Sequence, residues 1–401
     1  MNTKTFLENE PGRTEFQEYK KPTTDALCTT HQNDRRAILL ATQLVTDANL
    51  FSNGLFQNIL ILYDMFESLG FTSYLLVNKK PEKDEISQVL SRYKLIVCEE
   101  ILRNPMPIHC YIEIGMSVGS SFRLYLRNMG AKIIKLYLGN ILNIDIESVN
   151  CIPGIFFPHH IIGDLDEIWT SPHYGQNLEY GTALNRVPLE KGRIAPYVWE
   201  PCFFTQFGSR NLRWKQPESW TETPIVIMEP NISFQKSFIL PLLLVDAYSE
   251  QTPEWKGKLI VMNANRLKNN IHVMKSVMPG INLENRGRIV YKDRHTIAEV
   301  LEEYPSALFV GHQYNNDFNY MTFELMYAGV PLLHTSEAWS EFGYHWHHTK
   351  WSESIATLSR AVRYHADNLQ AYSSHAMQLY WHHSIHNPSN KMAWNTLINL
   401  P

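Results

Sequence analysis

Long hydrophobic runs are missing from this chain of 401 residues. No apolar segment reaches the roughly 18 residues that a membrane-spanning helix needs. The N-terminal segment also lacks the apolar core that marks a secretory signal peptide. These two absences predict a protein without a membrane span, located in the cytoplasm.

Cysteine is scarce, and neither charge sign dominates. The five cysteines are widely scattered, show no CxxC spacing and are odd in number, which indicates reduced thiols rather than a disulfide framework. The 36 basic side chains are balanced by 40 acidic ones. Because proteins that bind nucleic acids usually carry a basic excess, we expect no nucleic-acid partner.

The composition that is present, 44% apolar, 12% aromatic and 19% charged, is typical of a folded protein. The chain is too long for one ordinary hydrophobic core, so we expect two domains. We predict a flexible arm over residues 1–35, a first domain over 36–210, a second domain over 211–370 and a C-terminal helical segment over 371–401.

Short apolar strands alternate with helical patterns in both halves of the chain. In the first half we expect strands at residues 37–45, 73–77, 95–98, 111–114, 133–138 and 167–171, with helices at 56–69 and 120–129. In the second half we expect strands at 224–228, 258–262, 288–291, 307–310 and 330–333, with helices at 241–248 and 351–365. Pro241 should kink or delay the first of these two helices. The alternation implies right-handed strand–helix–strand units and predicts the α/β class, with two Rossmann-like, doubly wound parallel sheets.

The most informative segment, residues 305–336, reads PSALFVGHQYNNDFNYMTFELMYAGVPLLHTS. It predicts a strand, a polar loop, a helix that carries Glu324, a stop at Gly329 and a second strand. In open α/β sheets, ligands bind where the strands end. The first amides of a helix favour a phosphate, and a carboxylate one turn further can accept hydrogen bonds from ribose hydroxyls. The segment therefore predicts a nucleotide site.

The run FELMYAGVPLLH resembles the nucleotide-sugar motif of GT-B glycosyltransferases, particularly the retaining enzymes of family 4 and poorly characterised bacterial and viral relatives. The resemblance is specific around Glu324 and elsewhere follows the order of elements over residues 37–365. It implies two domains facing a central cleft, retention at the anomeric carbon, and transfer of a sugar from a nucleotide-diphosphate sugar to a glycan or another hydroxyl. Glu324 would contact the donor ribose. Those enzymes commonly have a second glutamate eight positions earlier, where this chain has Asn316, which leaves Asn316, Asp317 or His312 to handle the donor sugar.

The resemblance also implies where the donor diphosphate binds. The segment IVIMEPNISFQKS is similar to the first strand and loop of GT-B C-terminal domains, with Lys236 as the cation and Asn231 beside it. Arg266 follows the next strand, and Asn319 belongs to the loop before Glu324. Cations and helix ends must neutralise a diphosphate leaving group when no metal does. We therefore expect no metal and no cofactor besides the donor.

The first domain supplies the expected acceptor side. The segment SNGLFQN resembles the glycine-containing first loop of GT-B N-terminal domains and places Asn53 and Gly54 near the donor phosphate or the acceptor. Glu113 ends a predicted strand, where a carboxylate can approach an acceptor hydroxyl, and His160 can act as a base or a sugar contact. The candidate catalytic residues are Glu113, His160 and Asn316.

Two features that suggest metal chemistry are interpreted otherwise. The clusters HWHH and WHHSIH lack HExxH spacing and partner cysteines, so they indicate a partly buried aromatic surface. Asp164 and Asp166 form an Asp-x-Asp pair, which binds a metal in the GT-A glycosyltransferase fold. Here the pair precedes a predicted strand, and we expect it to cap a helix or turn.

Two rival functions remain open. A nucleotide-sugar epimerase uses the same scaffold and needs no acceptor, so incubation with donor alone separates it from a transferase. A non-catalytic nucleotide-sugar-binding protein is the other rival, favoured by Asn316 in place of a glutamate.

Overall fold

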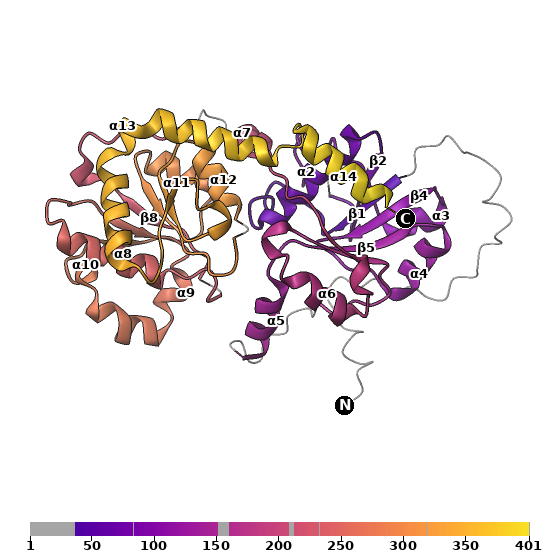
Figure 1. Ribbon diagram of the computed structural model, residues 1–401, viewed down its shortest axis with the longest axis horizontal. Helices are drawn as coiled ribbons and strands as arrows, with labels where there is room; N and C mark the ends of the chain where they lie inside the picture. The colour runs from indigo at the N-terminus through magenta and orange to yellow at the C-terminus, as the bar shows by residue number, and fades with distance from the viewer. Residues whose placement is uncertain are drawn as a thin grey trace. The chain divides into compact units, whose positions relative to one another are not determined.

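The computed structural model describes residues 37–82, 84–150, 160–207, 212–231, 233–317 and 319–400, so the predicted arm lies outside the described residues. The chain forms two compact units (Figure 1). Unit 1 combines the residues up to Trp199 with those from His383 onward, and unit 2 comprises Glu200–His382. The division thus lies before the predicted boundary at 210–211, and the segment 371–401 is shared between the two units.

Unit 1 is built on a seven-stranded sheet with the strand order β3-β2-β1-β4-β5-β6-β7. All neighbouring strands in it are parallel. Its strands are β1 (Ala37–Thr42), β2 (Thr72–Val77), β3 (Leu95–Ile96), β4 (Ile108–Glu113), β5 (Lys132–Tyr137), β6 (Glu167–Thr170) and β7 (Gly192–Ile194). Every residue of β1 is buried, as a parallel sheet covered by helices on both faces requires.

The helices of unit 1 cover this sheet. They are α2 (Gly54–Ser68), α3 (Cys98–Arg103), α4 (Ser120–Asn128), α5 (Ile141–Asn150), α6 (Asn177–Asn185) and α14 (Pro388–Asn399), with 3-10 turns η2 (Pro172–Tyr174) and η3 (Leu189–Lys191). The C-terminal α14 lies beside α2 (Figure 1). Its Trp394 is buried, with ring centroids 5.4 Å from Phe66 and 5.9 Å from Trp169. The end of the chain therefore completes the core of the first unit.

Unit 2 contains a six-stranded sheet with the order β10-β9-β8-β11-β12-β13, again with all neighbours parallel. Its strands are β8 (Ile225–Ile227), β9 (Leu259–Val261), β10 (Ile289–Tyr291), β11 (Leu308–Val310), β12 (Leu332–His334) and β13 (Tyr344–His345). The five strands predicted for this half are confirmed. The edge strand β13 escaped prediction because two residues carry no readable pattern.

The helices of unit 2 are α7 (Cys202–Phe207), α8 (Ile239–Gln251), α9 (Asn265–Lys268), α10 (Asn282–Asn285), α11 (Ile297–Glu303), α12 (Tyr320–Tyr327) and the long α13 (Trp351–His383). Short turns are η4 (Trp220–Glu222), η5 (Val273–Val277), η6 (Met278–Gly280) and η7 (Glu337–Trp339). The expected delay at Pro241 is wrong, because α8 begins before this residue and continues beyond it. The proline lies in the first helical turn, whose N–H groups have no partner within a helix.

One predicted strand of unit 1 also needs correction. The expected strand at 95–98 is reduced to Leu95 and Ile96, because Cys98 already begins α3. Residues 192–194, for which no strand was predicted, form the edge strand β7. Both cases concern sheet edges, where short strands give weak sequence signals.

The two sheet orders locate the ligand-binding edges. In unit 1 the chain winds outward from β1 to β3 on one side and from β4 to β7 on the other, so the winding direction switches between β1 and β4. In unit 2 the same switch lies between β8 and β11. Crevices at the carboxyl ends of such strand pairs are where open α/β sheets bind ligands.

Within the described ranges, no helix has both the length and the apolar character needed to cross a bilayer. Cys98, Cys110 and Cys202 are free thiols. Burial raises the pKa of Cys98 to about 12, which makes this thiol a poor nucleophile.

Candidate functional site

A buried carboxyl group lies at the switch point of unit 2. Glu229 follows β8 by two residues, and its side chain is 1% exposed. Its Oε1 accepts hydrogen bonds from the backbone N–H of His312 at 2.7 Å and from Nε2 of Gln313 at 3.2 Å. Its Oε2 is buried and has no hydrogen-bond partner among the described residues. Glu229 thus connects the end of β8 to the loop after β11, and its Oε2 remains an acceptor without a partner among the described residues.

The loop after β11 contributes further buried polar atoms without partners. His312 and Gln313 are each 3% exposed. Both ring nitrogens of His312 and Oε1 of Gln313 have no hydrogen-bond partner in the part of the chain that the structure describes. Gly311 makes the close approach feasible, because a Cβ there would lie 3.2 Å from Oε1 of Glu229. Buried polar groups are normally paired, so a group of such atoms at a switch point indicates a ligand site.

Burial sets the charges of this group. It raises the pKa of Glu229 to about 7, although the His312 N–H and the charge of Lys236 oppose the shift. Burial also lowers the pKa of His312 to about 4, so the imidazole is neutral near pH 7 and offers one donor and one acceptor. The pKa of Lys236 is lowered for the same reason, with Glu229 favouring its charged form.

Three asparagines with left-handed backbones shape the same sheet edge. Asn231, Asn263 and Asn315 follow β8, β9 and β11 with φ values of 55°, 55° and 49°. The side-chain amides of Asn231 and Asn263 both donate to the backbone oxygen of Glu229, at 2.9 and 3.0 Å. Asn231, predicted to bind the donor, also accepts from the N–H of Phe238 at 2.9 Å. Its side chain therefore holds the loop that carries Glu229.

The helix predicted to meet the nucleotide is α12. Asn319, expected to bind the donor, is its N-cap and accepts from the N–H of Met321 at 3.1 Å. Glu324 lies one turn into the helix and is 6% exposed, so it does not lie on a solvated face. Asn316 is half-buried in the preceding loop, and Oδ1 of the neighbouring Asp317 accepts from Ser336 at 2.6 Å.

Exposed aromatic rings flank the buried group. Phe234 and Tyr314 are 46% and 41% exposed, with ring centroids 6.1 Å apart. His348 lies edge-on to Tyr314 at 5.8 Å and to His312 at 6.4 Å. Arg266, the second predicted cation, is exposed on α9. Across the described residues, no three His, Cys, Asp or Glu side chains are grouped as metal ligands.

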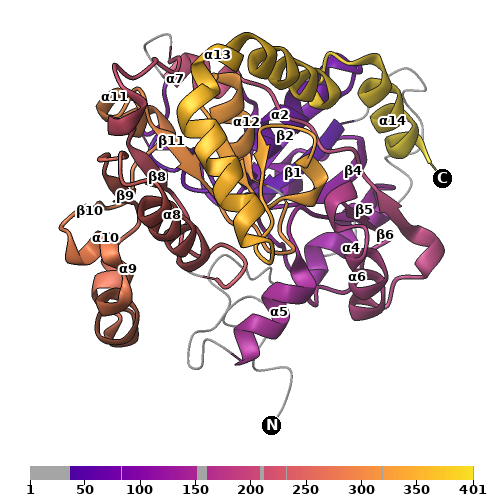
Figure 2. The ribbon, with the colours of Figure 1, turned by 60° about the vertical axis from the view of Figure 1, so that its left-hand side comes forward.

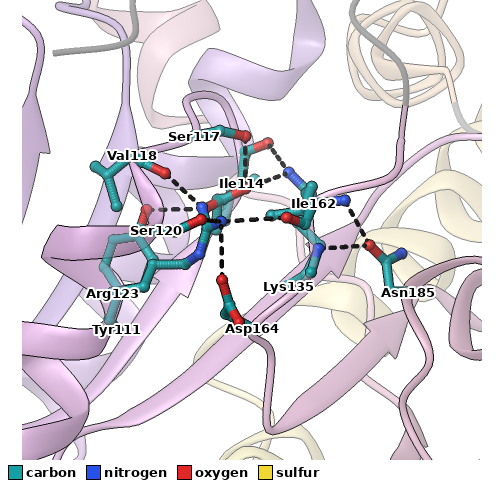
Figure 3. Close-up of polar contacts among 12 residues, drawn as sticks. Tyr111, Ile114, Ser117, Val118, Ser120, Arg123, Lys135, Ile162, Asp164 and Asn185 are labelled. Atoms are coloured by element: carbon teal, nitrogen blue, oxygen red, sulfur yellow. Dashed lines mark hydrogen bonds and ion pairs between the residues drawn. The ribbon is translucent and has the colours of Figure 1, made fainter. Parts of the chain in front are cut away.

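Glu113, the predicted carboxylate of the first domain, is the last residue of β4. Figure 3 shows Tyr111, Ser117, Arg123 and Lys135, the four residues that surround it. Glu113 is fully buried. Ser117 donates to its Oε1 at 2.5 Å and Tyr111 to its Oε2 at 3.0 Å. The cations of Lys135 and Arg123 lie 3.6 and 3.7 Å from the carboxylate. Glu113 thus serves as an internal counter-ion, a position from which a direct approach to an acceptor hydroxyl is obstructed.

His160 occupies a different position in unit 1. Its Nδ1 lies 2.6 Å from Oδ1 of Asp145, whose other oxygen accepts from Tyr180 at 2.8 Å. The backbone oxygen of His160 accepts from Tyr137, the last residue of β5, and from Asn185. The ring is fixed by a carboxylate, yet 22% of the side chain remains exposed.

The remaining predicted residues of unit 1 have local roles in the fold. Asn53 caps α2 by accepting from the N–H of Leu55 at 3.0 Å, and Gly54 is the first residue of that helix. Asp164 has a φ of 53° in the loop before β6, and its backbone oxygen accepts from Nη2 of Arg127 at 2.8 Å. Asp166 accepts from the N–H of Ile133 at 2.8 Å and thereby fixes the start of β5.

Sequence reasoning missed four residues that the structure brings into these sites: Glu229, Gln313, Asp145 and Tyr180. Glu229 had a usable signal, since it directly follows the apolar run IVIM at the end of a predicted strand. The other three lie in loops or helices, and their neighbours are distant in the chain.

Two Rossmann-like units, each with a parallel sheet and a switch point, define the GT-B fold, and solved structures support this. A glycosyltransferase from Rickettsia africae ESF-5 matches with a TM-score of 0.54 and 14% identity, covering 91% of this chain and 97% of that one. An alpha-glucosyltransferase in complex with UDP and a 13-mer DNA containing an HMU base matches with a TM-score of 0.55 and 13% identity, covering 92% and 100%. An alpha,alpha-trehalose 6-phosphate synthase from Burkholderia multivorans gives 0.54 and 10%, covering 91% and 98%.

At these identities the likeness establishes the fold. Over residues 38–398 the chain matches the family described as "Protein of unknown function (DUF2827)", and it belongs to that family. No curated protein matches it.

Proposed function

We propose that this protein is a glycosyltransferase that binds a nucleotide-diphosphate sugar in unit 2. The observation that carries the proposal is the group of buried, unpaired polar atoms of Glu229, His312 and Gln313 at the switch point between β8 and β11. His312 and Gln313 lie in the loop that leads from β11 to α12, the helix with the buried Glu324. Fold relatives that are glycosyltransferases, one of them in complex with UDP, support the same reading.

Each part of the donor would be bound by the protein groups that match its chemistry. Glu324 would accept hydrogen bonds from the ribose hydroxyls. Lys236, Arg266 and the N-terminus of α12 would stabilise the diphosphate, which gains charge as its bond to the anomeric carbon breaks. No metal or other cofactor belongs to this proposal.

On the acceptor side, the proposal rests on His160. Its imidazole is oriented by Asp145, as a proton-accepting histidine requires, and Nε2 would accept a hydrogen bond from the acceptor hydroxyl. That oxygen would form its bond to the anomeric carbon on the face from which the diphosphate leaves, as retention requires, and the hydroxyl proton would pass to Nε2 of His160. We propose retention of configuration, cytoplasmic action and a glycan or other hydroxyl compound as acceptor.

The first test concerns nucleotide binding. Calorimetric titration with UDP, GDP and ADP should identify one nucleotide that binds. The substitution Glu324→Ala should lower the affinity for that nucleotide by at least about tenfold, because lost hydrogen bonds to a charged group are worth about 1.5–3 kcal/mol. The exposed Glu341 provides the matched control, Glu341→Ala, which should bind as the wild type does.

Unchanged affinity in Glu324→Ala would contradict the assignment of α12. Turnover distinguishes the rivals, since a transferase releases the nucleoside diphosphate from its donor. A donor returned with an altered sugar would indicate an epimerase, and binding without any release would indicate a non-catalytic binding protein.

A further inference from the structure

The unpaired atoms at the switch point of unit 2 specify the chemistry of their ligand. When Glu229 is ionised, its Oε2 and Oε1 of Gln313 are acceptors, and the neutral ring of His312 offers one donor and one acceptor. All three side chains are at least nine-tenths buried. A buried polar group without a partner costs about 1–3 kcal/mol, so a complementary ligand would recover this free energy. That ligand must mainly donate hydrogen bonds.

This requirement excludes the phosphates of the donor from the group. Ionised phosphate oxygens only accept hydrogen bonds, and they would face a carboxyl group that carries negative charge when ionised. A divalent cation is disfavoured as well, because Lys236 lies close enough to Glu229 to perturb its pKa. A positive neighbour raises the cost of bringing in a second cation.

A sugar ring has the matching chemistry. Each hydroxyl donates one hydrogen bond and accepts others, so neighbouring hydroxyls can satisfy two acceptors and an imidazole together. The C–H face of a sugar is apolar, and the exposed rings of Phe234 and Tyr314, tilted by 58° to each other, offer apolar faces beside the group. A second carboxylate placed next to Glu229 would meet like charge at a site of low dielectric.

We infer that Glu229, His312 and Gln313 form the subsite for the hydroxyls of an uncharged donor sugar, with Glu229 selecting against uronic acids. The inference rests on the proposed function and adds to it the class of sugar. In the proposed function the nucleotide is bound by other residues of the unit, Glu324, Lys236 and Arg266, so the affinity for the bare nucleotide and the gain from the sugar are measured separately.

Calorimetric titration of the full chain tests the subsite without knowledge of the acceptor. The probes are UDP, GDP and ADP, followed by UDP-glucose, GDP-mannose or ADP-glucose according to the nucleotide that binds. The wild type should bind the sugar nucleotide at least tenfold more tightly than the nucleotide alone, and the corresponding uronic acid donor no more tightly than the nucleotide. Glu229→Gln and Gln313→Ala should lose most of the gain from the sugar, while their affinity for the bare nucleotide stays within twofold. Glu337→Gln, with a side chain that is 72% exposed, is the matched control.

The other possible results of the titration would contradict either the inference or the proposed function. Loss of nucleotide affinity in Glu229→Gln, with thermal stability unchanged, would assign the group to the nucleotide and overturn the inference. Binding that requires Mg²⁺ and disappears with a chelator would assign it to a cation. A wild type that binds a nucleotide but gains nothing from the sugar would overturn the inference and leave nucleotide binding standing. A chain that binds none of the nucleotides would overturn the proposed function together with the inference.

Discussion

At the scale of single residues, Glu229 is the most informative group. Its carboxyl sits in the interior, one oxygen is paired with the loop after β11, and burial holds its pKa near 7. A structural carboxylate is normally paired at both oxygens, as Glu113 is in unit 1. The two buried glutamates therefore differ: Glu113 is paired at both oxygens, whereas Oε2 of Glu229 has no hydrogen-bond partner among the described residues.

The raised pKa of Glu229 predicts a pH-dependent stability. The free side chain has a pKa of 4.5, so the folded protein, at about 7, binds this proton more tightly than the unfolded chain does. The contribution of Glu229 to the free energy of unfolding is therefore fully present below pH 4.5 and is lost as the pH rises towards 7. Glu229→Gln lacks this titration. Relative to wild type, it should gain up to about 3 kcal/mol between roughly pH 5 and pH 8.

Thermal unfolding at a series of pH values measures this difference. The titration of His312 occurs in both proteins, so it cancels in the comparison. The exposed variant Glu337→Gln should track the wild type at every pH. A constant difference between Glu229→Gln and the wild type over this range would show that Glu229 is already ionised at low pH.

At the scale of elements, α13 lies next to α12 (Figure 2), and its side chains hold the turn that follows α12. Gly329 ends α12 with a φ of 72°, and the chain then returns to β12. Tyr372 on α13 donates to the backbone oxygen of Val330 at 2.8 Å and accepts from the N–H of Leu332 at 3.2 Å. His365, on the same helix, lies 3.0 Å from the oxygen of Gly329. These contacts fix the end of the helix that carries Glu324.

Removing the hydroxyl of Tyr372 should therefore destabilise unit 2. Tyr372→Phe leaves a buried carbonyl and a buried N–H without partners, which should lower the free energy of unfolding by about 1–3 kcal/mol. Tyr364→Phe on the same helix is the matched control, because Tyr364 is 52% exposed. Denaturant titration compares the three proteins, and equal midpoints would contradict the bracing role.

At the scale of the whole molecule, the order of segments along the chain differs from their division into units. The chain builds unit 1, then unit 2, and its last residues return to unit 1. Trp394 on α14 is 1% exposed and packs against Phe66 of α2 and Trp169 of β6. The stability of the first unit therefore depends on residues near the C-terminus.

Trp394→Ala should destabilise unit 1 by about 3–5 kcal/mol, because the buried indole leaves a cavity. Met392→Ala is the control on the same helix, since Met392 is 69% exposed. Limited proteolysis should cleave the variant first in unit 1, and calorimetry should show that unit 2 unfolds as in the wild type. A loss confined to unit 2, or none at all, would contradict this packing.

The sequence by itself determined the fold class and most strands, because apolar runs between helical patterns are local signals. It also placed Glu324 in a helix after a polar loop, and that helix is α12. For the same reason it failed at β13 and at the end of β3, where the elements are two residues long.

Only the tertiary structure decided which polar groups are left unpaired. Glu229 and Gln313 are 84 positions apart, and the sheet order alone makes β8 and β11 neighbours. The same holds for the partners of Glu113 and His160. A hydrogen bond between distant segments depends on strand order and burial, and neither quantity is encoded in local pattern or propensity.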